Sequence, residues 1–311
     1  MKNLKPVARF TFVAFFSMLI LTACSAGKAK EGYLHNGDVS LFYKEMGAGI
    51  PIIILHGGPG FGFRYLESHL RFLSEKFKVI FFDQRGCGRS DGDGSTPVSM
   101  EQLVNDIEYL RKTKGYERIN LLGHSFGSIL ALEYARKYPE KCGSLALISS
   151  EYLSTVYWPR NADISRLSSD EKSAFNRIVR EGAYKIKDPD ILSFYFRCLF
   201  KTAMYDGSQA ERIDLGLDES RIDKMFHVME ELRPFLKESL YSIVFEKELQ
   251  APVLIVQGEK DIFSPDSAMH LHDRLPNSIF IIYNEAGHFP FIEKEYDFKQ
   301  DIIRFFTMYA K

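Results

Sequence analysis

The chain alternates between short apolar runs and longer segments whose apolar residues recur at helical spacing. Residues 39–47 alternate between apolar and polar side chains, as in a strand with one exposed face. Apolar runs without alternation predict strands within the ranges 51–58, 78–86, 118–125, 143–150, 251–261 and 278–287, several of which end in glycine or polar residues. Helical spacing predicts helices in the ranges 63–76, 99–115, 126–140, 267–275 and 296–310. Unbroken apolar strands that alternate with helices indicate a mostly parallel sheet with both faces covered, which is a doubly wound α/β fold.

The alternation stops in the range 152–248. This stretch is rich in aromatic and charged residues, has helical spacing and contains no unbroken strand run. Ligands of doubly wound sheets bind beyond the carboxyl ends of the strands, and an insertion that leaves from such an end lies over the binding region. We therefore expect a core made of residues 33–151 and 249–311, covered by a helical lid at 152–248.

Ser125 lies where a predicted strand passes into a predicted helix, within the sequence Gly-His-Ser-Phe-Gly at 123–127. This is the context of a nucleophile elbow, a tight turn that lifts a serine above the sheet. Flanking glycines leave room for the neighbouring strand and helix, while the serine takes a strained backbone conformation. The helix N-terminus favours negative charge there. The pattern predicts that Ser125 is a nucleophile, and the alternative is an ordinary glycine-rich turn.

A serine hydroxyl is a weak nucleophile without a neighbouring base. Among the eight histidines, His56 and His288 stand out because they lie at the carboxyl ends of predicted strands. His288 lies in a loop beyond the last strand, and we predict that it is the base. His56 is expected to shape its own loop instead. His124 is expected to point to the other side of the turn and to have a structural role.

The base needs a carboxylate to orient its ring. Asp261 ends the segment 251–261, just after the apolar run of a predicted strand, and the chain order Ser125, Asp261, His288 is the order expected after a serine elbow. Glu151 and Glu259 are the competing candidates. Asp261 is the predicted orienting residue.

The negative charge that develops on a substrate oxygen needs backbone N–H donors. We expect the amides of Phe126 and of Gly58, which we favour over Gly57. Glycines in the sequence His-Gly-Gly-Pro-Gly let the backbone approach the substrate. The other residues of this segment are expected to support the loop, and they are His56, Gly57, Pro59 and Gly60.

A second polar segment, at 83–90, follows another predicted strand. Asp83, Arg85 and Arg89 are expected to form a buried or half-buried network that holds the loop behind the glycines. We assign them supporting roles and no part in the chemistry.

The first residues, 1–24, have the pattern of an export signal. A basic start without acidic residues precedes an apolar run at 10–23, which is short for a bilayer-spanning helix. The sequence Leu-Thr-Ala-Cys resembles the lipobox of bacterial lipoproteins. That resemblance implies a lipid anchor on Cys24 and a membrane-anchored, exported protein, with 25–32 as a tether. The alternative is a plain signal peptide or an uncleaved anchor helix.

Composition, net charge and the number of cysteines exclude several classes of function. The 311 residues are 45% hydrophobic and 26% charged, with a formal net charge of −1, so nothing suggests a nucleic-acid partner. Without the lipobox residue three cysteines remain, an odd number that argues against a disulfide framework. No Cys or His pair has zinc spacing, so we expect no metal.

Three motifs together resemble those of a known family. The sequences HGGPG at 56–60, DQRGCGRS at 83–90 and GHSFG at 123–127 stand in the order and spacing of the proline iminopeptidases, which are serine peptidases with the α/β-hydrolase fold. The resemblance covers about 33–150 and 250–311. It implies release of an N-terminal residue, often proline, from a small peptide through an acyl-enzyme, without a cofactor.

Two departures from the family concern the substrate amine. Some relatives place a glutamate directly after the catalytic acid, where this chain has Ile262, and the ENHYF stretch of many bacterial members is missing. The carboxylates that could replace them are Glu151, Glu211, Glu230 and Glu231. An esterase or lactonase acting on small carboxylic esters is therefore the alternative enzyme. A tethered binding protein that has lost catalysis is the alternative from another class.

Overall fold

The structure is a computed structural model that describes residues 29–92, 96–150, 163–238 and 249–310. Within these ranges eight strands form one sheet, in the order β1-β2-β4-β3-β5-β6-β7-β8. The strands are β1 (Lys30–Asn36), β2 (Val39–Met46), β3 (Pro51–Leu55), β4 (Lys78–Phe82), β5 (Ile119–His124), β6 (Cys142–Ile148), β7 (Val253–Gly258) and β8 (Ser278–Tyr283). β3 to β8 run parallel, whereas β2 is antiparallel to β1 and β4.

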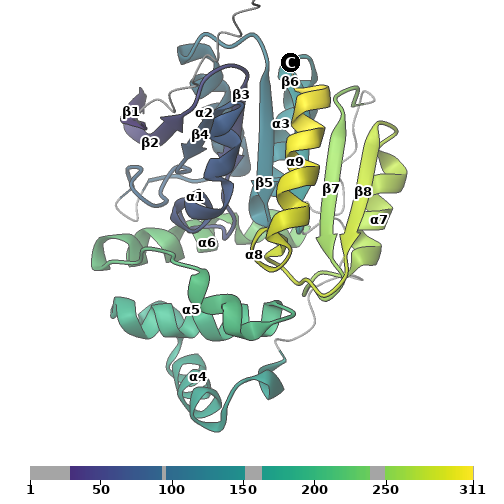
Figure 1. The fold of residues 1–311 in the computed structure, drawn as a ribbon. Helices are drawn as coiled ribbons and strands as arrows, with labels where there is room; N and C mark the ends of the chain where they lie inside the picture. The colour runs from purple at the N-terminus through teal and green to yellow at the C-terminus, as the bar shows by residue number, and fades with distance from the viewer. Residues whose placement is uncertain (1–28, 93–95, 151–162, 239–248, 311) are drawn as a thin grey trace, which may run out of the picture.

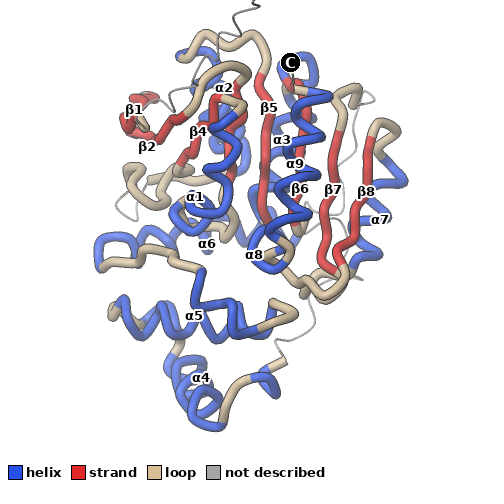
Figure 2. Tube along the Cα trace, viewed as in Figure 1, coloured by secondary structure: helices blue, strands red, loops and turns tan. Residues whose placement is uncertain are grey.

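Helices connect the strands, as the alternating pattern predicts (Figure 2). Those of the core are α1 (Arg64–Leu70), α2 (Met100–Thr113), α3 (Phe126–Lys137), α7 (Pro265–Arg274), α8 (Pro290–Glu293) and α9 (Glu295–Tyr309). The Ser99 hydroxyl accepts the backbone N–H of Gln102 and caps α2, which is the start expected from the sequence. α3 ends two residues before Pro139, which cannot continue a helix.

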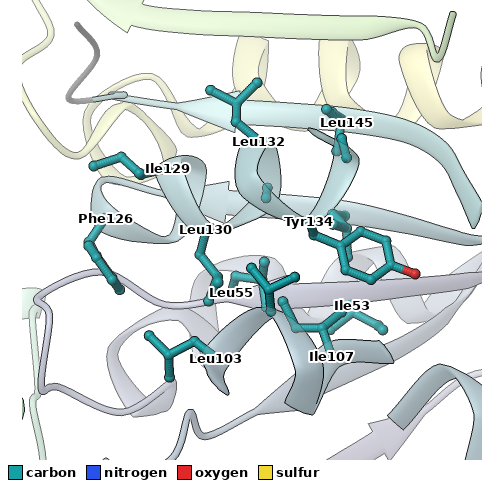
Figure 3. Close-up of a cluster of buried hydrophobic side chains, with 14 of the residues drawn as sticks. Ile53, Leu55, Leu103, Ile107, Phe126, Ile129, Leu130, Leu132, Tyr134 and Leu145 are labelled. Carbon is teal, nitrogen blue, oxygen red and sulfur yellow. The ribbon is translucent and has the colours of Figure 1, made fainter. Parts of the chain in front are cut away.

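The two faces of the sheet carry two separate hydrophobic cores. Ile53 and Leu55 of β3 point to the face covered by α2, α3 and α7, while Ile52 and Ile54 point to the face covered by α1, α8 and α9. Figure 3 shows part of the first core, where side chains of α2 and α3 meet those of β3, with Leu130 among them. Burial on both faces explains why these strands are unbroken apolar runs.

The helical insertion lies beyond the carboxyl ends of the parallel strands (Figure 1). Its described helices are α4 (Ser169–Glu181), α5 (Pro189–Ala203) and α6 (Glu219–Glu238), which we call the lid. α4 and α5 have a small core of their own around Phe175 and Cys198. The doubly wound fold with a helical insertion, predicted from the sequence, is therefore confirmed.

The N-terminal boundary differs from the expectation. β1 begins at Lys30, so residues 30–32 of the expected tether are strand. They are held by pairing with β2, where Lys30 stands opposite Glu45, and such pairing is not visible in the local sequence. The expected signal peptide and Cys24 lie outside the described residues. Among the described residues, no helix combines the length and the apolar character that a membrane span requires.

Candidate active site

Ser125 stands on a strained turn between β5 and α3. Its φ of 54° and ψ of −122° lie where side-chain-bearing residues are rarely found, and its N–H donates to the carbonyl of Ile148 at 2.9 Å. A Cβ on Gly123 would lie 2.2 Å from the Gly127 carbonyl oxygen, and one on Gly127 would lie 2.2 Å from the Leu55 carbonyl oxygen. Close backbone approach therefore requires glycine on both sides of the serine.

His288 and Asp261 form a buried hydrogen-bonded pair. His288 Nδ1 lies 2.9 Å from Asp261 Oδ1. The other carboxylate oxygen accepts from Gln257 Nε2 at 2.7 Å, and the Phe263 N–H also donates to Oδ1 at 3.1 Å. Because a carboxylate accepts, Nδ1 of His288 is the donor to Asp261, and in the neutral ring Nε2 has the lone pair that can accept a proton from a hydroxyl.

The loop that carries His288 is fixed against the elbow and the lid. The His288 carbonyl lies 2.8 Å from Nε2 of His124, the residue before Ser125, and its N–H donates to the Ala203 carbonyl at 2.8 Å. Glu293 accepts the N–H of Gly287 at 2.7 Å. These bonds place the backbone of the imidazole-bearing residue beside the elbow.

The glycine loop, residues 56–60, lies against the nucleophile. A Cβ on Gly57 would be 3.0 Å from the Ser125 Cβ. The Gly57 N–H donates to the Tyr65 hydroxyl at 2.8 Å, which favours the next amide, that of Gly58, for a substrate oxygen. Gly58 has a φ of +127° and precedes Pro59 through a cis peptide bond, and Gly60 has a φ of +94°.

Phe126 supplies the other expected donor. It is the first residue of α3, and the first amides of a helix have no acceptor within the helix.

His56 links the glycine loop to the segment at 83–90. Its Nε2 accepts the N–H of Gln84 at 3.1 Å, so Nδ1 bears the proton and donates to the Gly57 carbonyl at 2.9 Å. Gln84 Nε2 also donates to the His56 carbonyl at 2.8 Å. Complete burial lowers the pKa of His56 from 6.5 to about 4, which leaves the ring neutral at pH 7.

Asp83 holds two loops through their backbone. Its Oδ1 accepts the N–H of Phe63 and its Oδ2 accepts the N–H of Arg89, both at 2.8 Å. Burial raises the pKa of Asp83 to about 6, although both hydrogen bonds act against that rise.

The expected network of Asp83, Arg85 and Arg89 is not a single network. Among the hydrogen bonds of the described residues, the Asp83 carboxylate accepts two backbone N–H groups and is bonded to neither guanidinium. Arg85 instead forms a two-bond pair with Asp106 of α2, at 2.8 and 2.9 Å. The Arg89 guanidinium is partly exposed and pairs with Glu31 of β1 at 2.8 Å. The prediction of one network was wrong, because the partners Asp106 and Glu31 come from distant segments.

An aromatic wall joins the lid to the site. Phe61, beside the glycine loop, has its ring centroid 5.1 Å from that of Phe196 and 6.3 Å from that of Phe200, both on α5. Phe200 lies 5.1 Å from Phe289, the neighbour of His288. The described lid therefore presents apolar rings on this side.

The described carboxylates of the insertion that were named from the sequence are exposed to solvent. Glu211 pairs with Arg197 at 2.9 Å and Glu230 pairs with Arg233 at 2.5 Å, and all four side chains are exposed. Glu231 is also exposed. Glu151 lies outside the described residues. Glu259, the other competing acid, is exposed and pairs with Lys260.

Two residues of the site were not singled out from the sequence. Tyr65 occupies an apolar position of a helical pattern and resembles any core aromatic. Gln257 carried a signal, because it is a buried polar residue within an otherwise apolar strand and it binds Asp261.

Comparisons with known proteins agree with this architecture. A family model described as "alpha/beta hydrolase fold" matches residues 50–295. A proline iminopeptidase of Clostridioides difficile is 28% identical over 289 residues, covering 86% of this chain and 94% of that protein. The solved proline iminopeptidase of Mycobacterium smegmatis has a TM-score of 0.61 and 22% identity, over 90% of this chain and 98% of that one. An esterase of Thermogutta terrifontis has a TM-score of 0.63 and 19% identity, over 91% and 100%.

Acid should weaken the fold through His56. Its pKa is about 4 in the folded chain and 6.5 when unperturbed, so unfolding takes up a proton between these pH values. The free energy of unfolding therefore falls as pH falls through this interval, by about 3 kcal/mol at about 1.4 kcal/mol per pKa unit. The destabilisation caused by His56→Gln should be about 3 kcal/mol smaller at pH 4 than at pH 7 in urea unfolding. An equal destabilisation at both pH values would contradict this assignment.

Proposed function

The chain belongs to the α/β-hydrolase fold family, and we propose that it is a serine hydrolase in which Ser125, His288 and Asp261 carry out the chemistry. The observation that carries this proposal is the Asp261–His288 hydrogen bond, which leaves Nε2 of a buried imidazole able to accept a proton beside the elbow that presents Ser125.

In the proposed reaction the Ser125 Oγ attacks a carbonyl carbon while His288 Nε2 takes the hydroxyl proton. The N–H groups of Gly58 and Phe126 bind the oxygen that becomes negative. As the tetrahedral intermediate collapses, the imidazolium gives its proton to the leaving amine or alcohol, and an acyl-enzyme remains. Water then attacks the acyl carbon with His288 again as base, which releases the acid and restores Ser125. Asp261 holds the ring and stabilises its charge throughout.

The first candidate reaction is the release of an N-terminal residue, proline or another small apolar one, from a short peptide or amide. The motifs at 56–60, 83–90 and 123–127 and the similarity to proline iminopeptidases along most of the chain support it. Such a substrate brings an ammonium group close to the reacting carbonyl.

The second candidate is the hydrolysis of a small carboxylic ester. The aromatic wall and Ile262 favour it, because an uncharged acyl group needs no carboxylate partner, and the exposed lid carboxylates Glu211 and Glu230 pair with arginines.

We also propose that the protein is exported and anchored by a lipid on Cys24. The basic start, the apolar run and the lipobox-like sequence at 21–24 support this.

A fluorophosphonate probe should label the full-length protein at one serine. Ser125→Ala should abolish the labelling and lower turnover by about 10⁴-fold or more, because the nucleophile is gone. Ser173→Ala, an exposed serine on α4, is the matched control and should be labelled normally. If the wild type is not labelled, the chain is the non-catalytic binding protein instead.

The substrate amine separates the two candidate reactions. With a peptidase, kcat/KM for proline p-nitroanilide should drop by at least about tenfold when the proline nitrogen is acetylated, since a lost charged contact is worth at least about 1.4 kcal/mol. The esterase would be favoured if proline p-nitroanilide and its N-acetyl derivative were hydrolysed at equal rates. In that case kcat/KM for p-nitrophenyl acetate, corrected for its uncatalysed hydrolysis, should exceed kcat/KM for either anilide.

The anchor can be tested by feeding an alkyne-labelled fatty acid to a bacterial host. The wild type should incorporate the label and sediment with membranes, whereas Cys24→Ser should do neither. Ser25→Ala is the matched control and should remain labelled. Incorporation into Cys24→Ser would show that this residue is not the acceptor.

A further inference from the structure

A continuous set of buried hydrogen bonds crosses the site from the glycine loop to the loop of His288. The Gly57 N–H lies 2.8 Å from the Tyr65 hydroxyl, which lies 2.7 Å from Nδ1 of His124. Nε2 of His124 lies 2.8 Å from the carbonyl oxygen of His288. Tyr65 and His124 are 3% and 2% exposed, so bulk water does not compete for these hydrogen bonds. Three segments that are distant in sequence are joined by two side chains.

The partners determine the direction of each bond. A carbonyl oxygen only accepts, so Nε2 of His124 bears a proton. The Tyr65 oxygen already accepts from the Gly57 amide, and its own hydrogen is directed to the lone pair on Nδ1. His124 is therefore a neutral ring with its proton on Nε2. Burial and the nearby His288 both lower the pKa of His124 well below its ordinary value, in agreement with this assignment.

We propose that Tyr65 and His124 are positioning residues, which set the glycine loop and the backbone of His288 relative to Ser125. This inference rests on the proposed function of the protein as a serine hydrolase. At one end the pair engages the Gly57 amide, so that the next amide, Gly58, faces the substrate oxygen. At the other end the pair binds the backbone carbonyl of His288, the residue that takes the proton of the Ser125 hydroxyl in the proposed reaction.

The neutral state of His124 matters because its ring lies close to that of His288. The two centroids are 4.9 Å apart. During the reaction His288 becomes an imidazolium, and a second positive ring at this distance would oppose that charge. The hydroxyl hydrogen of Tyr65 occupies the only free lone pair of His124, which keeps a proton from binding there. Phe289 and Phe291, with ring centroids 5.3 and 5.0 Å from that of His124, keep the ring from turning.

Removal of the Tyr65 hydroxyl tests this role in the full-length protein. With whichever of proline p-nitroanilide and p-nitrophenyl acetate the wild type hydrolyses, Tyr65→Phe should lower kcat by about 10- to 100-fold with KM changed less than about twofold, because displaced reacting groups slow the chemical step. Tyr134→Phe is the matched control: this tyrosine is fully buried and donates to Glu108 at 3.0 Å, away from the site. It should lower the melting temperature similarly and leave kcat unchanged. Equal kcat values for the two variants would overturn the positioning role.

Nitrogen NMR of histidine-labelled protein reports the bond pattern without relying on activity. At pH 7 the His124 signal, assigned with His124→Gln, should show a protonated Nε2 and a hydrogen-bonded, unprotonated Nδ1. In Tyr65→Phe the Nδ1 signal should move to the position of a free lone pair, while Tyr134→Phe leaves it unchanged. A charged ring or a proton on Nδ1 in the wild type would overturn the proposal. If the fluorophosphonate probe does not label the wild type, the proposed hydrolase function is wrong. The NMR signals would still show whether Tyr65 and His124 form the proposed hydrogen bonds.

Discussion

The close approach of backbone at the turn between β5 and α3 is the constraint on which the site depends. Gly123 and Gly127 contact neighbouring backbone so closely that any side chain would displace α3 or β3. The turn leaves Ser125 with a positive φ, which is tolerated because its N–H bonds to β6 and the helix behind it is buried. The sheet, both cores and α3 together hold one serine in a conformation that it would not adopt alone.

The other parts of the site are supplied by loops at the same edge of the sheet. Parallel strands end together there, so residues far apart in sequence meet without any contact encoded locally. Asp261 follows β7 and His288 follows β8, and their hydrogen bond closes the distance between the two loops. Many of the hydrogen bonds that fix these loops involve backbone groups. Asp83 accepts two backbone N–H groups, and His288 is bonded through both its N–H and its carbonyl.

Two buried histidines of the site, His56 and His124, are neutral and have the same pattern of hydrogen bonds. His56 and His124 each accept one hydrogen bond and donate another to a backbone carbonyl, which satisfies both nitrogens without charge. Burial lowers the pKa of both rings. His288 differs, because one of its nitrogens faces a carboxylate. The environment of each ring, and not the residue type, separates a structural histidine from a proposed base.

Much of this protein followed from local sequence: the parallel strands, the helices between them, the insertion and the elbow at Ser125 all depend on spacing and on residue type within short segments. The pairing of Asp261 with His288 also followed, because chain order and strand ends predict it. The partners of Arg85 and Arg89, the start of β1 and the roles of Tyr65 and Gln257 did not. Each depends on which distant segment lies opposite, and only tertiary packing determines that. Sequence periodicity shows which face of an element is buried, but not which atom it meets there.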